Sequence, residues 1–215
     1  MTFALSGSVT TGPEAFVRLA RLCAALDAER AGPVMLDCQA LRWCDGNLCA
    51  ALAACLAPTV LRLGSVPVSL PTTEVRTFWQ RNGFGSHLHI LPWPDSYGSA
   101  IPFRLFAPTA HREAHRYVHE SFTAQAGVLP EMTPVLLNRM CGQLCEVFDN
   151  AFEHADSRHG VFCCGQHFPK KNRLAFTIAD AGIGFAGSAS RRRRCRHGRG
   201  LRRGRARVPI GVGPA

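Results

Sequence analysis

The sequence predicts an α/β fold, also described as α+β, and three features of its pattern support this prediction. Over the first ninety residues, strand-like apolar runs alternate with stretches of helical apolar spacing. Two longer helical patterns at 109–126 and 134–155 are followed by two strand patterns at 160–168 and 173–180. Apolar residues make up 47% of the 215-residue chain, which is enough to bury a substantial core.

The elements expected in residues 1–90 follow from periodicity and turn signals. Apolar residues recur at helical spacing from Phe16 to Leu26, and the pair Asn82-Gly83 marks the end of a later helix. The expected order is strand 3–9, helix 13–30, strand 33–38, turn 42–47, helix 48–56, strand 66–70 and helix 73–81. Strands separated by helices predict a parallel or mixed sheet with helical cover.

Two fragments of this region, "VMLDCQALRWCDGNLCAALAACL" and "VRTFWQRNGF", carry a family resemblance. Together with the element order, they resemble the STAS domain of anti-sigma-factor antagonists over residues 3–89. In that family a serine at the start of a helix is phosphorylated, and Asn47 stands where that serine would fall. An asparagine can cap a helix but cannot accept phosphate. The resemblance therefore implies a protein-docking or purely structural role for a STAS-like domain at 1–90.

Residues 91–108 are rich in turn-forming residues. Four prolines and two glycine or serine turn signals occur in this stretch. We therefore expect a linker or crossover segment here, followed by a second domain at 109–185.

A row of polar residues lies along one face of the helix predicted at 134–155. Glu146, Asn150 and His154 are spaced i, i+4, i+8, which places them on one helical face. Such a row is commonly the solvated face of an amphipathic helix. The fragment "RLAFTIADAGIGF" adds a strand that ends at Asp180, followed by Gly182 and Gly184, which let the backbone approach a ligand closely.

The Glu-x3-Asn helix and the later acid-x-Gly-x-Gly turn, with a strand pair between them, resemble the GHKL ATPase family. This family includes histidine kinases, type II topoisomerases, Hsp90 and MutL-type proteins, and its ATP site uses the Bergerat fold. The resemblance covers residues 141–185 and is closest to the small bacterial ATP-binding proteins of the superfamily. It implies a partial Bergerat-fold α/β sandwich at 109–185.

The resemblance also implies roles for individual residues. Asn150 would bind the Mg²⁺ ion that bridges the ATP phosphates, and Glu146 would orient or deprotonate the attacking water if ATP is hydrolysed. Asp180 would accept a hydrogen bond from the adenine amino group, while Gly182 and Gly184 would leave room for the base. A complete site also needs a lid, a second glycine-rich box and further strands, and none is found after Phe185.

The excess positive charge lies in the last thirty residues. The formal net charge is +10, yet all 15 acidic residues and 15 of the 25 basic residues precede Ile183. Residues 186–215 are mainly Arg, Gly, Ala and Pro, which predicts a disordered Arg-rich tail. Two interpretations stay open: a frameshifted or degenerate gene end, and a genuine arm that binds phosphate backbones.

Composition and cysteine placement indicate a cytoplasmic protein. No apolar run is long enough to span a bilayer, and the first residues lack the basic start of a signal peptide. The ten cysteines are scattered through apolar stretches, so we expect buried reduced thiols rather than disulfides.

Two groups of potential metal ligands are not expected to bind metal. His154, His159 and His167 lie near Cys163 and Cys164, but neighbouring strand residues point to opposite faces. A second set shares one face of the helix at 109–126 without an evident carboxylate or thiolate partner. It consists of His111, His115 and His119.

The leading functional hypothesis is an ATP/Mg-binding regulatory protein of the histidine kinase-like superfamily, impaired by loss of the lid and second glycine box. An ATPase and a kinase-like ATP-binding protein are the enzyme classes that stay open. The alternatives are a non-enzymatic interaction module with a vestigial ATP site and a nucleic-acid binder that uses its arginine tail. A protein partner is expected in the first two cases, and a membrane partner in none.

Overall fold

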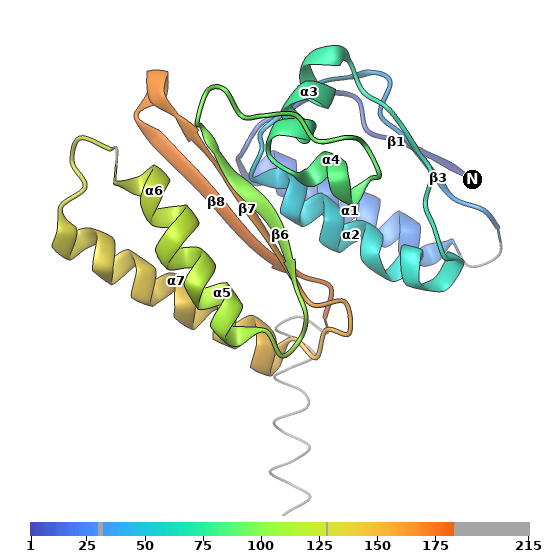
Figure 1. Ribbon diagram of the computed structural model, residues 1–215. Coiled ribbons are helices and arrows are strands. Elements are labelled where there is room, and N and C mark those ends of the chain that lie inside the picture. Colours follow the sequence, from blue (N-terminus) through green and yellow to red (C-terminus); the bar gives the residue numbers. More distant parts are fainter. Residues whose placement is uncertain (30–31, 128, 183–215) are drawn as a thin grey trace, which may run out of the picture. The chain divides into compact units, whose positions relative to one another are not determined.

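The computed structural model describes residues 1–182 apart from 30, 31 and 128, and this part of the chain forms one compact unit. The expected α/β class is confirmed, because helices and strands of both halves pack together (Figure 1). The tail predicted at 186–215 and the candidate site residue Gly184 lie outside the described residues.

The first half of the unit contains short parallel strands and three substantial helices. Strands β1, β3 and β5 pair in parallel in that order, and β2 pairs in parallel with β4. The elements are β1 (Thr2–Ala4), β2 (Gly7–Val9), α1 (Pro13–Ala28), β3 (Met35–Asp37), β4 (Leu41–Cys44), α2 (Leu48–Leu63), β5 (Val68–Ser69), α3 (Thr73–Arg81) and α4 (Phe84–His87). The expected turn at 42–47 is thus partly a strand, and α2 continues through Pro58 beyond its expected end.

The second half contains an antiparallel sheet with strand order β6-β7-β8. Helix α7 and the two last strands lie within two residues of the bounds predicted from periodicity. The elements are β6 (Ala100–Phe106), α5 (His111–Tyr117), the π-helical turn η1 (Val118–Phe122), α6 (Thr123–Ala126), α7 (Pro134–His154), β7 (Val161–Phe168), the 3-10 turn η2 (Pro169–Lys171) and β8 (Arg173–Asp180).

Residues 91–108, expected to be a linker, contribute the edge strand β6. Ile101 and Phe103 pack into cores on opposite faces of the sheet, although residues two apart in a regular strand share a face, because the register of β6 shifts between Ile101 and Arg104. Pro102 is tolerated because an edge strand does not need every backbone N–H, and the pairing of β6 with β7 shifts register at this point. The two halves are therefore joined through a shared sheet.

The antiparallel sheet is covered by helices on both faces. Figure 1 shows α5, α6 and α7 on one face and α1 and α2 on the other. Helix α2 contacts β7, β8 and α1, so its N-terminal part is buried almost all round, whereas Val60 and Leu61 near its end are exposed. Cys163 belongs to the core beneath α7, while Cys164 belongs to the core around α2, which confirms that these neighbours point to opposite faces.

The nine cysteines within the described residues are all free, and most are buried, as expected from their apolar surroundings. Across the described part of the chain, no helix combines the length and apolarity needed to cross a membrane.

Candidate functional site

Helix α7 presents the first two candidate residues. The helix begins with Pro134 in its first turn, and the Thr133 side chain caps it by accepting a hydrogen bond from the Leu136 N–H at 3.2 Å. Cys141 and Phe148 are fully buried against the sheet. Glu146 and Asn150 lie on a solvent-exposed part of the helix, one turn apart, as their spacing predicts.

The end of β8 supplies the third candidate. Asp180 pairs with Val161 at the end of the strand, and its carboxylate is exposed. Its Oδ1 accepts a hydrogen bond from the Gly182 N–H at 2.9 Å. This short turn fixes one oxygen of the carboxylate and leaves Oδ2 without a partner among the described residues.

Gly182 brings the end of β8 against the end of α7. A Cβ atom at Gly182 would lie 1.9 Å from the carbonyl oxygen of Ala155, which is shorter than any tolerated contact. The position therefore requires glycine for close approach rather than for a special φ. Asn150 precedes Ala155 by five residues, or about 7.5 Å along the helix axis. The structure thus brings the strand end to the C-terminal part of the helix that carries Glu146 and Asn150.

A carboxylate joins two of the histidines for which the sequence indicated no acidic partner. Asp149 Oδ1 lies 2.9 Å from His111 Nδ1 and 3.0 Å from His115 Nε2, so this acid links α5 to α7. The pairing was missed because the partners lie 38 and 34 residues apart in sequence. Within the part of the chain described here, no group of three or more residues has an arrangement that would hold a metal ion.

The pKa of Asp149 reflects two opposing effects. Desolvation raises the pKa of this carboxyl, whereas hydrogen bonds and charges from His111 and His115 lower it more, so the net pKa lies below its ordinary value. Asp149 is therefore ionised at neutral pH and is committed to the histidines. Asp149 and Asn150 are consecutive, so their side chains leave the helix about 100° apart, and Asp149 faces the histidines of α5.

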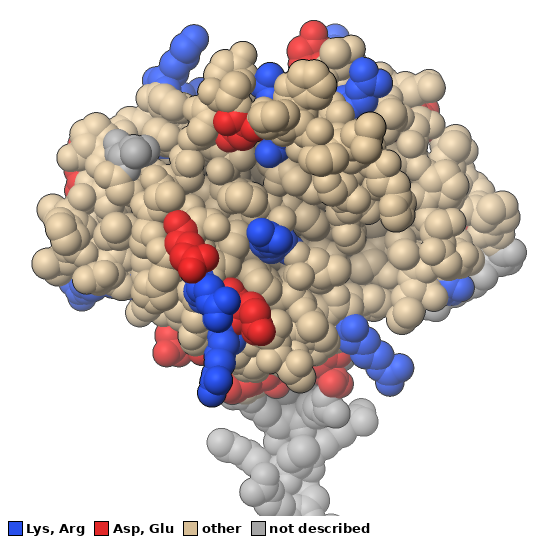
Figure 2. Space-filling model, viewed as in Figure 1, with Lys and Arg blue, Asp and Glu red and all other residues tan. Residues whose placement is uncertain are grey.

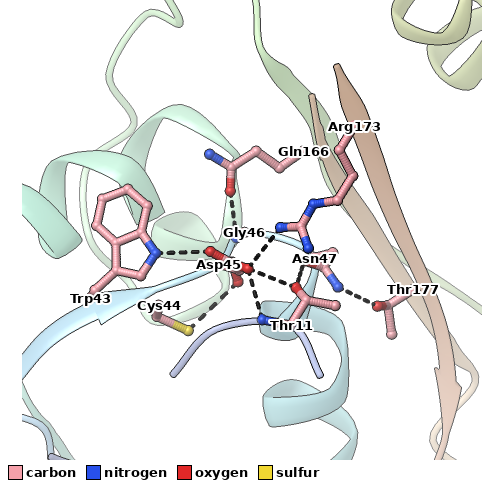
Figure 3. Close-up of polar contacts among 9 residues, drawn as sticks. All are labelled: Thr11, Trp43, Cys44, Asp45, Gly46, Asn47, Gln166, Arg173 and Thr177. Carbon is pink, nitrogen blue, oxygen red and sulfur yellow. Dashed lines mark hydrogen bonds and ion pairs between the residues drawn. The ribbon is translucent and has the colours of Figure 1, made fainter. Parts of the chain in front are cut away.

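The strongest buried polar cluster lies elsewhere, around the loop Asp45-Gly46-Asn47 (Figure 3). Asp45 accepts hydrogen bonds from the Thr11 N–H and from Trp43 Nε1, both at 2.8 Å. Arg173 of β8 approaches the same carboxylate at 3.3 Å. The Thr11 hydroxyl lies within hydrogen-bond distance of both Asp45 and Asn47 and can donate its one proton to either.

This loop fastens the first half of the protein to the antiparallel sheet. Gln166 Oε1 accepts the Gly46 N–H at 2.8 Å, and Asn47 Nδ2 donates to the Thr177 hydroxyl at 3.0 Å. Asn47 is only 1% exposed, and its side chain does not cap α2. Asn47 is therefore a buried structural contact between the loop and β8.

The pKa of Asp45 is lowered although the side chain is buried. Desolvation raises its pKa, but the Thr11 and Trp43 hydrogen bonds and the Arg173 charge together lower the pKa by more than desolvation raises it. A buried carboxylate held by this many donors is a rigid structural group and has no open side toward a substrate.

Three surface hollows lie away from the Glu146–Asp180 corner. One of about 600 Å³ lies beside α3, one of about 490 Å³ lies between β6 and α5, and one of about 260 Å³ lies beside β1 and α1. Lys170 and Lys171 are exposed in η2 between β7 and β8, as a hairpin turn predicts. On the face shown in Figure 2, positive and negative side chains are interspersed over α5, and much of the remaining surface is uncharged.

Comparisons with protein-family models, with curated proteins and with solved structures found no match to this chain.

Proposed function

We propose that the protein binds ATP with Mg²⁺ and acts as a nucleotide-binding regulator similar to the GHKL ATPases. The observation that supports this most directly is the contact between Gly182 and Ala155, which joins the strand end bearing Asp180 to the helix bearing Asn150. If the polar face of α7 were only a solvated helix surface, it would not need the end of β8 packed beside it. The resemblance to a STAS-like domain in the first half belongs to the same proposal.

The oxygen atoms of Glu146, Asn150 and Asp180 suit binding of Mg²⁺ and of an adenine amino group. Glu146 and Asn150 have no hydrogen-bond or ion-pair partner among the described residues, so their oxygen atoms are available to a hard cation. Asp180 keeps Oδ2 available for an amino group, because its other oxygen is held by the Gly182 N–H. Mg²⁺, when bound, would neutralise charge on the phosphates. Glu146 would then be positioned to accept a proton from a nearby water.

The size of the expected stabilisation depends on the affinity for ATP. For a dissociation constant ten times below the ATP concentration, binding would stabilise the fold by about 1.4 kcal/mol. For a unit of this size, that corresponds to a rise in melting temperature of roughly 3–5 °C.

The test is a thermal-shift titration of the full chain with ATP and Mg²⁺ at millimolar concentrations. Asn150→Ala and Asp180→Ala should each abolish the shift. Glu153→Ala, which removes an exposed acid from the same helix, should retain it. Magnesium tripolyphosphate has a similar charge but no base, so it controls for binding to the arginines of residues 191–207. A shift that tripolyphosphate reproduces, or that survives both alanine variants, would exclude this site.

A further inference from the structure

A groove beside α3 combines an apolar wall with a basic wall. It has a volume of about 600 Å³ and is open to solvent. Leu70, Ile90, Leu91 and Trp93 contribute apolar surface, while Arg76 and Arg81 project from α3. No acidic residue lines it. We call this feature the α3 groove.

The groove is held open by hydrogen bonds between the helix and the segment that follows α4. Gln80 Nε2 donates to the carbonyl oxygen of Leu91 at 2.7 Å, and the Trp93 N–H donates to the carbonyl oxygen of Gln80 at 3.3 Å. On the inner side of α3, Trp79 is completely buried against Phe84. Both walls are therefore anchored, and the groove is formed before any partner arrives.

Large apolar side chains along this segment are left in water. Leu91 is 81% exposed, Trp93 is 58% exposed and Tyr97, just beyond the groove, is 76% exposed. Clustered exposed aromatic and aliphatic side chains mark an interaction surface, and Trp, Tyr and Arg are the residues enriched at the centres of protein interfaces.

The basic wall lacks its counter-charge. Within the described residues, neither Arg76 nor Arg81 forms an ion pair with a carboxylate. The Arg81 guanidinium lies over the Tyr97 ring at 4.7 Å, and its Nε atom is buried without a hydrogen-bond acceptor among these residues. Because Nε is buried, the terminal N–H groups of this guanidinium are the ones that can bind a carboxylate in the groove, and the Tyr97 ring holds them in place.

We propose that the α3 groove binds an acidic segment of a partner protein, with an apolar side chain against Trp93 and carboxylates against Arg76 and Arg81. The arginines of residues 191–207 would be repelled by Arg76 and Arg81, so we do not propose the chain's own arginine-rich sequence as the occupant. A nucleic acid fits poorly, because a phosphate backbone needs a longer line of cations than these two arginines and gains little from the leucine and isoleucine surface. This proposal does not depend on nucleotide binding.

The test is selection of a phage library of random dodecapeptides on the full-length protein, with counter-selection on Arg76→Glu/Arg81→Glu. Enriched peptides should contain two or more acidic residues near a large apolar residue. Their synthetic versions should shift Trp93 fluorescence, and a Trp93→Phe variant should lose that signal. Binding should weaken at least tenfold in Arg76→Gln/Arg81→Met, which removes charge while keeping side-chain volume.

Arg112→Gln/Arg139→Met makes the same charge change on exposed positions of α5 and α7 and should leave peptide affinity within twofold. Three results would overturn the proposal. The first is enrichment of peptides without acidic residues, or no enrichment. The second is tighter binding of single-stranded oligothymidylate than of the selected peptides. The third is a dimer in sedimentation that dissociates in the groove variant, which would identify a second copy as the occupant.

Discussion

Replacing Asp45 by alanine should destabilise the whole described unit. The change removes the acceptor for the Thr11 N–H and Trp43 Nε1, each at 2.8 Å, and the ion-pair partner of Arg173 at 3.3 Å. Hydrogen bonds to a charged group contribute about 1.5–3 kcal/mol each but are not additive, and removing one member of a buried pair costs roughly 3–5 kcal/mol. Because the Arg173 side chain is 38% exposed and can be resolvated, we expect about 3 kcal/mol.

Guanidinium unfolding followed by two probes provides the assay. The three tryptophans, at 43, 79 and 93, all precede β6, so fluorescence reports on the first half, whereas far-ultraviolet circular dichroism also reports on α5 and α7. Both guanidinium transitions should coincide and shift together in Asp45→Ala. In a thermal scan, the same variant should melt at a temperature lower by roughly 6–12 °C. Asp27→Ala, at an exposed position of α1, should change stability by less than about 0.5 kcal/mol.

Two results would refute this reasoning. A loss below about 1 kcal/mol in Asp45→Ala would mean that the buried cluster contributes little net stability. Separate fluorescence and dichroism transitions in the wild type would mean that the two halves unfold independently, as two domains joined by a linker would.

Further predictions concern α7 and its contacts. Gly182→Ala should cost about 1–3 kcal/mol in guanidinium unfolding, because the new Cβ would meet the Ala155 carbonyl oxygen at 1.9 Å. Gly142→Ala, within α7 and with open space around it, should instead stabilise by about 0.5–1 kcal/mol; equal effects would contradict the predicted close contact. Asp149 has a lowered pKa, so its two histidine contacts should stabilise the fold fully above the unfolded-state pKa of about 4. The stability difference between wild type and Asp149→Asn, measured by urea unfolding across pH, should therefore shrink as pH falls below this value, and a difference that grows there would oppose the assignment.

Local patterns predicted most of the secondary structure. Helix α7 and strands β7 and β8 were located closely from their sequence, because apolar periodicity, a Thr-Pro helix start and a hairpin turn are encoded within a few residues. Strand β6 was not predicted. The four prolines of residues 91–108 suggest a linker, and the pairing of β6 with β7 depends on residues about sixty positions later.

The candidate site was predictable only in part. The shared exposed face of Glu146 and Asn150 follows from helical spacing, whereas the contact of Gly182 with Ala155 is a tertiary packing result. The burial of Asn47 also required the structure. Its partner Thr177 lies 130 residues away, and nothing in the loop sequence indicates that α2 packs on the antiparallel sheet.

Direct binding of nucleotide tests the central claim most directly. Equilibrium dialysis of the full chain with radiolabelled ATP, with and without Mg²⁺, should show Mg²⁺-dependent binding that unlabelled GTP displaces poorly, because Asp180 can accept a hydrogen bond from the adenine amino group but not from the guanine carbonyl. Asp180→Asn should lose this preference, and Asn150→Ala should lose the dependence on Mg²⁺. Absence of binding at millimolar ATP, or binding unchanged in both variants, would contradict the account.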